Sequence, residues 1–486
     1  MDKKETNRIF KVTTIFGGVQ AVVVLGGLVK SKVAAVFLGP VGVGESSIYN
    51  NTVTLLVGLL GLGVGQSAIK FIAQAINPER KKILSRDTRL LSYSLAIIAL
   101  LLTCLLSPFL SKVQFGDMSH VFGFCLMGAA ICFTIVQQGT DSLLRSYKRT
   151  KSIAYSSLFN SILNVGVYTL FYVIWGEKVI AVVIMLGAFI SMCISAYYSR
   201  DIGRLERINI NNRVLSRMYP IVTLGIMMVI ASFMDSFVTN LVVYFIRIKE
   251  SLNAVGMYQS ALSISSMAIG MVYTAIANDY YPSLAESITS KEKQNNLINT
   301  QMNVNIHLLG PILLIMIVVA DLLIRLFLAE EFLPISGFIS WIFFACFCLS
   351  FSWCTLYLPL SYGHKKRYLL LTLVNCLIIA ICQIPLFYYW GLKGIAIGYF
   401  LSKLLYSIVM YVVSYRTYSF QLAKKNIMDY ILYSVLFLSL IFLKDEIHIH
   451  WGIQSLIALA GCTYSLYVIS KSSDVISVVK SKLNRK

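Results

Sequence analysis

Residues 38–44, LGPVGVG, form a predicted tight turn between two long apolar segments, and this hairpin decides how the chain is organised. The segments on either side, 9–37 and 45–75, are each long enough to cross a membrane as a helix. The first segment contains Lys30 and Lys32 within an otherwise apolar run. Charged side chains inside a membrane span are costly, and they normally face a bundle interior or a watery cavity. The hairpin therefore indicates a membrane protein with a cationic interior.

The composition of the whole chain fits a membrane protein. Of its 486 residues, 57% are hydrophobic and 13% are charged, whereas a soluble protein carries about 25% charged residues. The net charge of +20 would suggest nucleic acid as the partner of a soluble protein. Here the basic residues are sorted by loop, so we expect no nucleic acid. The ten cysteines lie in apolar segments without the spacing of a metal site, so we expect no disulfide, metal or cofactor.

We predict an all-α polytopic membrane protein with about fourteen transmembrane helices. Lys and Arg gather in alternate connections, such as 80–82, 200–216 and 365–367, and at both ends of the chain. Basic loops stay in the cytoplasm, so both termini are predicted to be cytoplasmic. The predicted spans are 9–37, 45–75, 88–110, 119–144, 152–174, 179–199, 217–246, 254–282, 297–328, 335–360, 368–390, 393–415, 427–443 and 452–470.

An internal repeat divides the chain into two six-helix lobes. Ser146 recurs 215 residues later as Ser361, and the dipeptide Trp-Gly at 175–176 recurs at 390–391 with the same offset. The offset spans an even number of helices, so both copies keep the same orientation and are related by a pseudo-two-fold axis along the membrane normal. The predicted parts are an N-terminal lobe, a cytoplasmic linker, a C-terminal lobe, and two extra helices with a basic tail, at 1–199, 200–216, 217–415 and 416–486.

The layout of six, six and two helices resembles the polysaccharide flippases of the multidrug/oligosaccharidyl-lipid/polysaccharide exporter superfamily. The lysine-bearing first helix before LGPVG and the glycine-rich segment 58–65, GLLGLGVG, are similar to the start of O-antigen and enterobacterial-antigen translocases. The resemblance implies a V-shaped cavity between two lobes and alternating access. It also implies a substrate, undecaprenyl-diphosphate-linked oligosaccharide, that is moved across the bacterial cytoplasmic membrane in O-antigen or lipopolysaccharide biosynthesis.

Four lysines are candidates for binding such a substrate in a cationic cavity, since a diphosphate needs positive charge. Lys30 and Lys32 point about 200° apart on a helix, so only one faces the cavity squarely. We favour Lys32, which precedes Pro40 by eight residues as in similar translocases. Lys70 lies in the inward part of the second span and Lys403 near the middle of the twelfth. The alternative for each is snorkelling to the headgroups or pairing with an acid.

Five further charged residues are candidates for ion coupling or gating. Asp235 lies near the middle of the seventh span, where a carboxylate is a functional candidate by default. Glu45 begins the second span, where the helix dipole alone favours an acid. Asp279 lies at the inner end of the eighth span, as a gate or a helix end. Asp321 and Arg325 are four residues apart, a spacing that also predicts a structural helical pair.

Three classes of function compete. The first span has lysines and no acid, which favours a flippase for an anionic glycan lipid over a cation-coupled multidrug exporter. The short outer loops, without a phosphate-binding or nucleophile motif, argue against a membrane enzyme such as a polymerase or ligase. We expect a monomer in contact with membrane lipids and with the glycan polymerase and glycosyltransferases of its pathway.

Overall fold

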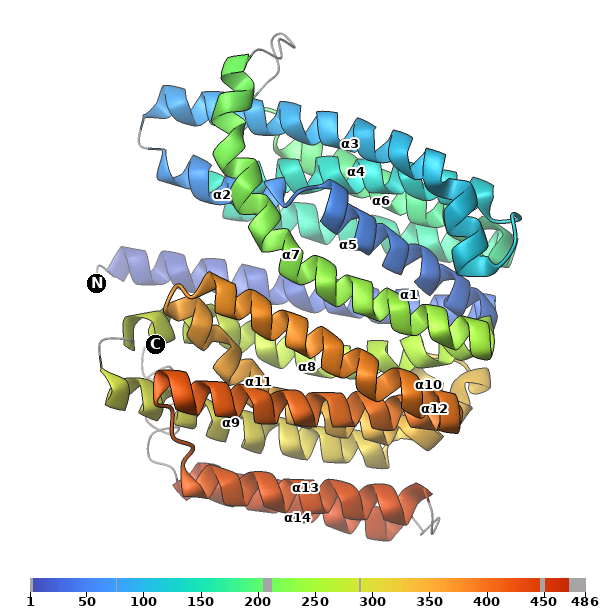
Figure 1. The fold of residues 1–486 in the computed structure, drawn as a ribbon, viewed down its shortest axis with the longest axis vertical. Coiled ribbons are helices and arrows are strands. Elements are labelled where there is room, and N and C mark those ends of the chain that lie inside the picture. The colour runs from blue at the N-terminus through green and yellow to red at the C-terminus, as the bar shows by residue number, and fades with distance from the viewer. Residues whose placement is uncertain (1–2, 76, 204–211, 288–289, 446–450, 472–486) are drawn as a thin grey trace. The chain divides into compact units, whose positions relative to one another are not determined.

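The computed structural model describes residues 3–75, 77–203, 212–287, 290–445 and 451–471, and within these ranges the regular secondary structure is entirely helical. Figure 1 shows the arrangement. The α-helices are α1 (Lys3–Leu60), α2 (Val64–Gln74), α3 (Pro78–Phe115), α4 (Val121–Ser146), α5 (Thr150–Trp175), α6 (Ile180–Tyr198), α7 (Asn212–Lys249), α8 (Leu252–Glu286), α9 (Lys291–Val318), α10 (Ala320–Phe327), α11 (Ser336–Ser361), α12 (Lys365–Tyr418), α13 (Lys424–Asp445) and α14 (Trp451–Lys471), with 3₁₀ turns η1 (Gly176–Val179) and η3 (Glu330–Ile335).

Nine helical segments in the described part are long and apolar enough to cross a membrane. Three of them, Val22–Leu60, Thr150–Tyr198 and Lys365–Tyr418, contain 39, 49 and 54 residues, and each overlaps two of the predicted spans. At about 1.5 Å per residue, even the shortest of these three is far longer than one crossing of the hydrocarbon core requires. The prediction of an all-α polytopic membrane protein is confirmed.

The chain folds into two compact units. Unit 1 comprises the residues up to Gly256 together with Phe327–Ala329, and unit 2 comprises the remainder. Helix α7 belongs to unit 1, where the buried carboxylate of Asp87 in α3 accepts a hydrogen bond from Arg217 Nε of α7 at 2.8 Å. The sequence repeat groups α7 with the second lobe instead, and that division stays a prediction.

The turn of the first hairpin is shorter than the turn predicted at residues 38–44. Gly39, at φ 61°, is the non-helical residue within α1, and the helix resumes at Pro40. Proline is well suited to this place because its missing N–H and fixed φ match the first position of a helix. The turn also lies against the start of α8, since a Cβ on Gly256 would fall 1.9 Å from the Pro40 carbonyl oxygen. Glycine is required there because the two backbones touch.

A second break interrupts the predicted span 45–75. Helix α1 ends at Leu60, and α2 begins after Gly63, which has a φ of 60°. A Cβ on Gly63 would lie 2.5 Å from the carbonyl oxygen of Gly225 in α7, so the two backbones approach closely. The glycines of this span therefore allow close packing and also end one helix and start the next.

The sequence repeat is also a repeat of backbone conformation. Arg149, before α5, and His364, before α12, both have φ −79° and ψ 65°. Gly176, after α5, has φ 59° and ψ −135°, and Gly391, inside α12, has φ 57° and ψ −141°. These positions are separated by the same 215 residues as the sequence matches. The two helical hairpins are therefore built around matching corners.

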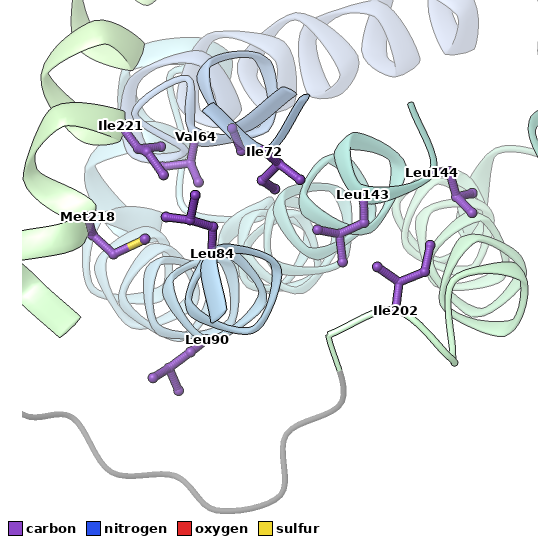
Figure 2. Close-up of a cluster of buried hydrophobic side chains, with 10 residues drawn as sticks. Val64, Ile72, Leu84, Leu90, Leu143, Leu144, Ile202, Met218 and Ile221 are labelled. Carbon is purple, nitrogen blue, oxygen red and sulfur yellow. The ribbon is translucent and has the colours of Figure 1, made fainter. Parts of the chain in front are cut away.

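Apolar side chains hold the helices of each unit together. In unit 1 a buried cluster joins α2, α3, α4 and α7 near the ends of these helices, with Val64, Leu84 and Ile221 pointing toward one another (Figure 2). In unit 2, side chains of α9 and α11 such as Leu313 and Phe343 are fully buried. Burial of such side chains stabilises the fold by about 1.5–3 kcal/mol each in water, and in lipid their close packing takes over that role.

Candidate functional site

A cavity of about 520 Å³ lies inside unit 1, among α1, α4, α5 and α6. Its size falls within the range of about 300–1,000 Å³ that is usual for small-molecule sites. Valine, alanine, isoleucine and glycine residues form its apolar wall. Its polar lining residues are Lys30 and Asn50 of α1, Thr134 and Gln137 of α4, Ser157, Asn160, Ser161, Asn164 and Tyr168 of α5, and Ser191 of α6.

Lys30 gives the cavity its charge. Its ammonium nitrogen lies 3.7 Å from the centroid of the Tyr168 ring, which is the geometry of a cation–π contact. Among the described residues that line the cavity, none carries a carboxylate. A partly buried cation without an acid beside it attracts anions more strongly than a surface lysine does, because water screens it less. The cavity is therefore suited to an anionic group.

Beside this cation, three neutral side chains form a hydrogen-bonded network. Ser191 Oγ donates to Asn160 Oδ1 at 2.7 Å, and Asn164 Nδ2 lies 3.3 Å from Ser191 Oγ. Asn164 Nδ2 also donates to the Asn160 carbonyl oxygen one turn earlier in α5, at 3.0 Å. The network fixes the amide groups of two asparagines at the cavity wall. Such groups can both donate to and accept from the hydroxyl groups of a sugar.

Two glycines leave the room that these polar side chains occupy. A Cβ on Gly187 of α6 would lie 2.6 Å from Asn164 Oδ1 and 3.1 Å from Tyr168 Cε2. A Cβ on Gly26 of α1 would lie 2.3 Å from Ser161 Oγ. Any larger residue at either position would push the polar groups of α5 out of place.

The four predicted lysines lie in different surroundings. Lys30 lines the cavity, whereas Lys32 is absent from the described lining and donates a hydrogen bond to the Leu328 carbonyl oxygen. This agrees with the expected separation of about 200° between them, although the sequence favoured Lys32. Lys70 is exposed on α2. Lys403 is buried in unit 2, where its ammonium lies 5.2 Å from the centroid of the Tyr399 ring. A shared role for all four stays a prediction.

The acidic candidates also have distinct surroundings. Glu45 is mostly buried, and its carboxylate lies 4.0 Å from Nε2 of His120 in the connection between α3 and α4. Asp235 is exposed on α7. The side chain of Asp279 lies outside the part of the chain that the structure describes.

The predicted pair of α10 has partners beyond its own helix. Asp321 accepts a hydrogen bond from Ser336 and lies 3.9 Å from Lys444 Nζ, while Arg325 Nη1 donates to Glu330 at 2.9 Å. These contacts connect the first turn of α10, at Asp321, and its last turn, at Arg325, to neighbouring residues. A part in ion coupling or gating stays a prediction for them and for Glu45, Asp235 and Asp279.

Sequence reasoning missed the neutral side chains of the site. Ser157, Asn160, Asn164 and Tyr168 follow one another at spacings of three or four residues in an otherwise apolar span, and Ser161 lies beside Asn160. Residues at this spacing lie on one face of a helix. A polar stripe along a membrane helix was thus the available signal.

Unit 2 contains a second buried polar cluster, away from any predicted residue. His307 Nε2 of α9 lies 3.1 Å from Asp429 Oδ2 of α13, and the Tyr464 hydroxyl of α14 donates to Asp429 Oδ1 at 2.6 Å. His307 Nδ1 lies 3.1 Å from Ser465 Oγ, also of α14. Among the described residues, no group of three histidine, cysteine or acidic residues is placed to hold a metal ion. The cluster therefore connects α9 with the last two helices through hydrogen bonds.

Comparison with known proteins places this geometry in context. The family model described as "Polysaccharide biosynthesis protein" matches residues 10–288, more than half of the chain. No curated protein matches the sequence significantly.

Several solved structures share the fold. An inward-facing multidrug resistance transporter of the MATE family in the MOP superfamily superposes with a TM-score of 0.72 at 16% identity, over 82% of this chain and 94% of its own. The lipid II flippase MurJ in an inward closed conformation gives 0.68 at 14% identity, over 95% and 100%. The Vibrio cholerae MATE transporter VcmN in its bent form gives 0.55 at 14% identity, over 87% and 98%. At these identities the likeness concerns the fold alone.

Proposed function

We propose that this chain, which belongs to the polysaccharide biosynthesis protein family, is a flippase for an undecaprenyl-diphosphate-linked oligosaccharide. In this proposal it carries an O-antigen unit or a related surface polysaccharide unit across the bacterial cytoplasmic membrane by alternating access, with both termini in the cytoplasm. It acts as a transporter rather than an enzyme, as a monomer, and beside the polymerase and glycosyltransferases that make and use its substrate.

The observation that carries the proposal is the cavity of unit 1, which combines one cation with neutral amides and hydroxyls. Moving a diphosphate through hydrocarbon alone would cost tens of kcal/mol, as for any isolated ion in a medium of low dielectric constant. Lys30 offers the phosphate a partner inside the membrane, and Asn160, Asn164 and Ser191 offer the sugar hydrogen bonds. Lys32, Lys70 and Lys403 provide further positive charge along the proposed path, and Asp235 and Glu45 are the proposed sites of ion coupling.

The rival function is a cation-coupled multidrug exporter, since MATE transporters share the fold. A site for cationic drugs needs negative charge, and the described lining of the cavity holds a lysine and no acid. The sign of the charge therefore supports the flippase.

The test is complementation of a flippase-deficient strain, scored as surface glycan per amount of membrane-inserted protein. Lys30→Met should lower export by about tenfold or more, since hydrogen bonds to charged groups contribute about 1.5–3 kcal/mol. Lys30→Arg should retain more export than Lys30→Met because it keeps the charge, and Lys30→Glu should be the most defective because it repels the phosphates. Lys151→Met, which removes an exposed lysine of α5, is the control for a lost charge. Normal export by Lys30→Glu would refute the proposal that this cavity binds the anion.

A further inference from the structure

The contact between Lys30 and Tyr168 covers one face of the tyrosine ring, a surface on which a sugar could stack. The ammonium lies 3.7 Å from the ring centroid, over the face of the ring, and both residues line the cavity. A ring face that carries a cation is not open to a second partner. The apolar C–H face of a pyranose would need that same surface, since stacking on an aromatic ring buries apolar area.

The Tyr168 ring packs against neighbouring residues, whereas Lys30 has a long and flexible side chain. Tyr172 lies against Tyr168 at 5.5 Å between ring centroids in an edge-on geometry, and Gly187 of α6 lies so close that a Cβ there would fall 3.1 Å from Tyr168 Cε2. Lys30 reaches the ring through four flexible methylene groups and presents three donors that can turn toward another acceptor. The mobile member of the pair is therefore the cation.

We propose that Lys30 rests on Tyr168 when the cavity is empty, and that a bound phosphate draws the ammonium away and uncovers the ring for a sugar. The inference rests on the proposed function and names how the same cavity recognises its substrate. A phosphate group binds Lys30, a pyranose stacks on Tyr168, and the amides of Asn160 and Asn164 bind the sugar hydroxyls. Phosphate and sugar then favour each other's binding, because the phosphate removes the cation that competes with the sugar.

Thermodynamic reciprocity gives a test on the unaltered protein. The full chain in nanodiscs is titrated with N-acetylglucosamine by calorimetry, with and without saturating inorganic phosphate. The sugar should bind about three- to tenfold more tightly with phosphate present, the factor expected for release of a cation–π contact. Equal affinity in the two titrations would overturn the proposed exchange.

Substitution of Tyr168 distinguishes the contact of its ring with Lys30 from the contact of its ring with a sugar. Tyr168→Leu should bind inorganic phosphate about threefold more tightly, because Lys30 no longer has to leave an aromatic face. The same variant should bind N-acetylglucosamine 1-phosphate about tenfold more weakly, because the stacking surface is lost. Tyr168→Phe keeps the ring face and should restore the preference for the sugar phosphate. Tyr155→Leu, on an exposed position of the same helix, is the control for a lost aromatic side chain. If Tyr168→Leu weakens both probes equally, the tyrosine only packs.

Two further arms identify the source of the phosphate and isolate the inference from the function. Glycerol 1-phosphate stands for a phospholipid headgroup and should bind no better than inorganic phosphate, since it has no ring to stack. Equal affinity for glycerol 1-phosphate and the sugar phosphate would overturn the sugar site. If Lys30→Met exports glycan normally, the proposed function of the cavity fails. If Lys30→Met loses export while Tyr168→Leu shows no opposite effects on the two probes, only the exchange fails.

Discussion

The two helical hairpins that contain the corners at Gly176 and Gly391 share their backbone turns but enclose different interiors. In unit 1, Asn164 and Ser191 line an open cavity. At the offset of 215 residues, unit 2 carries Ile379 and Tyr406 in their places, both buried. The matching corners determine the course of the backbone. Whether a cavity lies between the helices depends on the side chains at a few positions of each helix. At these positions the two repeats have different residues.

The lysines that lie over tyrosine rings of the two hairpins belong to different helices. In unit 1 the cation over the tyrosine ring is Lys30 of α1. In unit 2 it is Lys403, at the position that corresponds to Ala188 of the cavity wall, and its ring is Tyr399 of the same helix. Both units therefore contain a contact between a lysine ammonium and a tyrosine ring, but the lysines belong to helices that do not correspond in the repeat.

The largest expected effect comes from giving unit 1 the side chains of unit 2. The double variant Asn164→Ile and Ser191→Tyr should fill the cavity and lower glycan export by about tenfold or more. The ligand would lose both the space that it occupies in the cavity and its hydrogen bonds to these two side chains. The protein should still fold, since the cavity of about 520 Å³ can take the added atoms. Export is measured by complementation and folding by the thermal transition of the purified protein. Normal export would show that the substrate does not enter this cavity.

A smaller effect is expected where unit 2 has Ser402 in place of Gly187. Gly187→Ser should destabilise the protein by about 1–3 kcal/mol, the usual cost of overpacking, because its Cβ would lie 2.6 Å from Asn164 Oδ1. Adding Asn164→Ala should relieve the clash and restore the thermal transition, but export should stay low because the amide is lost. A double variant no more stable than Gly187→Ser would place the strain elsewhere.

The smallest effect concerns the corner residues themselves. Arg149 pairs with Asp201 at 2.6 Å, whereas its counterpart His364 contacts the Tyr418 hydroxyl. The hydrogen bond from Arg149 holds the pKa of Asp201 below its usual value. The pair therefore stabilises the folded state above the pKa of an unfolded aspartate, and that contribution is lost as the pH falls through the folded pKa. Being partly exposed, it should contribute only about 0.2–1 kcal/mol.

The measurement for this pair is the difference in thermal transition between neutral and acidic pH. Wild type should lose slightly more stability on acidification than Asp201→Asn, which has no carboxylate to protonate. An equal loss in both proteins would mean that the pair contributes nothing to folding.

The sequence predicted the helical spans because long apolar runs and basic loops are local signals. It also predicted the repeat, and the matching backbone angles at Arg149 and His364 support it. The helix breaks at Gly39 and Gly63 were harder to place, because glycine serves both close packing and turns. The choice between Lys30 and Lys32 depended on the rotation of α1 against α5, which is a tertiary property. The amide network could not be read from the charged residues, because neutral polar side chains make up half of the residues that line the cavity.

The hydrogen-bonded cluster of His307, Asp429, Tyr464 and Ser465 bears on whether the last two helices can be removed from the fold. Helices α13 and α14 lie side by side (Figure 1) and supply every partner described for the His307 ring nitrogens. A shortened chain that ended after α12 would present a polar imidazole to lipid, which is costly. The hairpin is therefore not a detachable appendage, because α9 carries a residue that needs it. We expect deletion of the two helices to need a matching change at position 307.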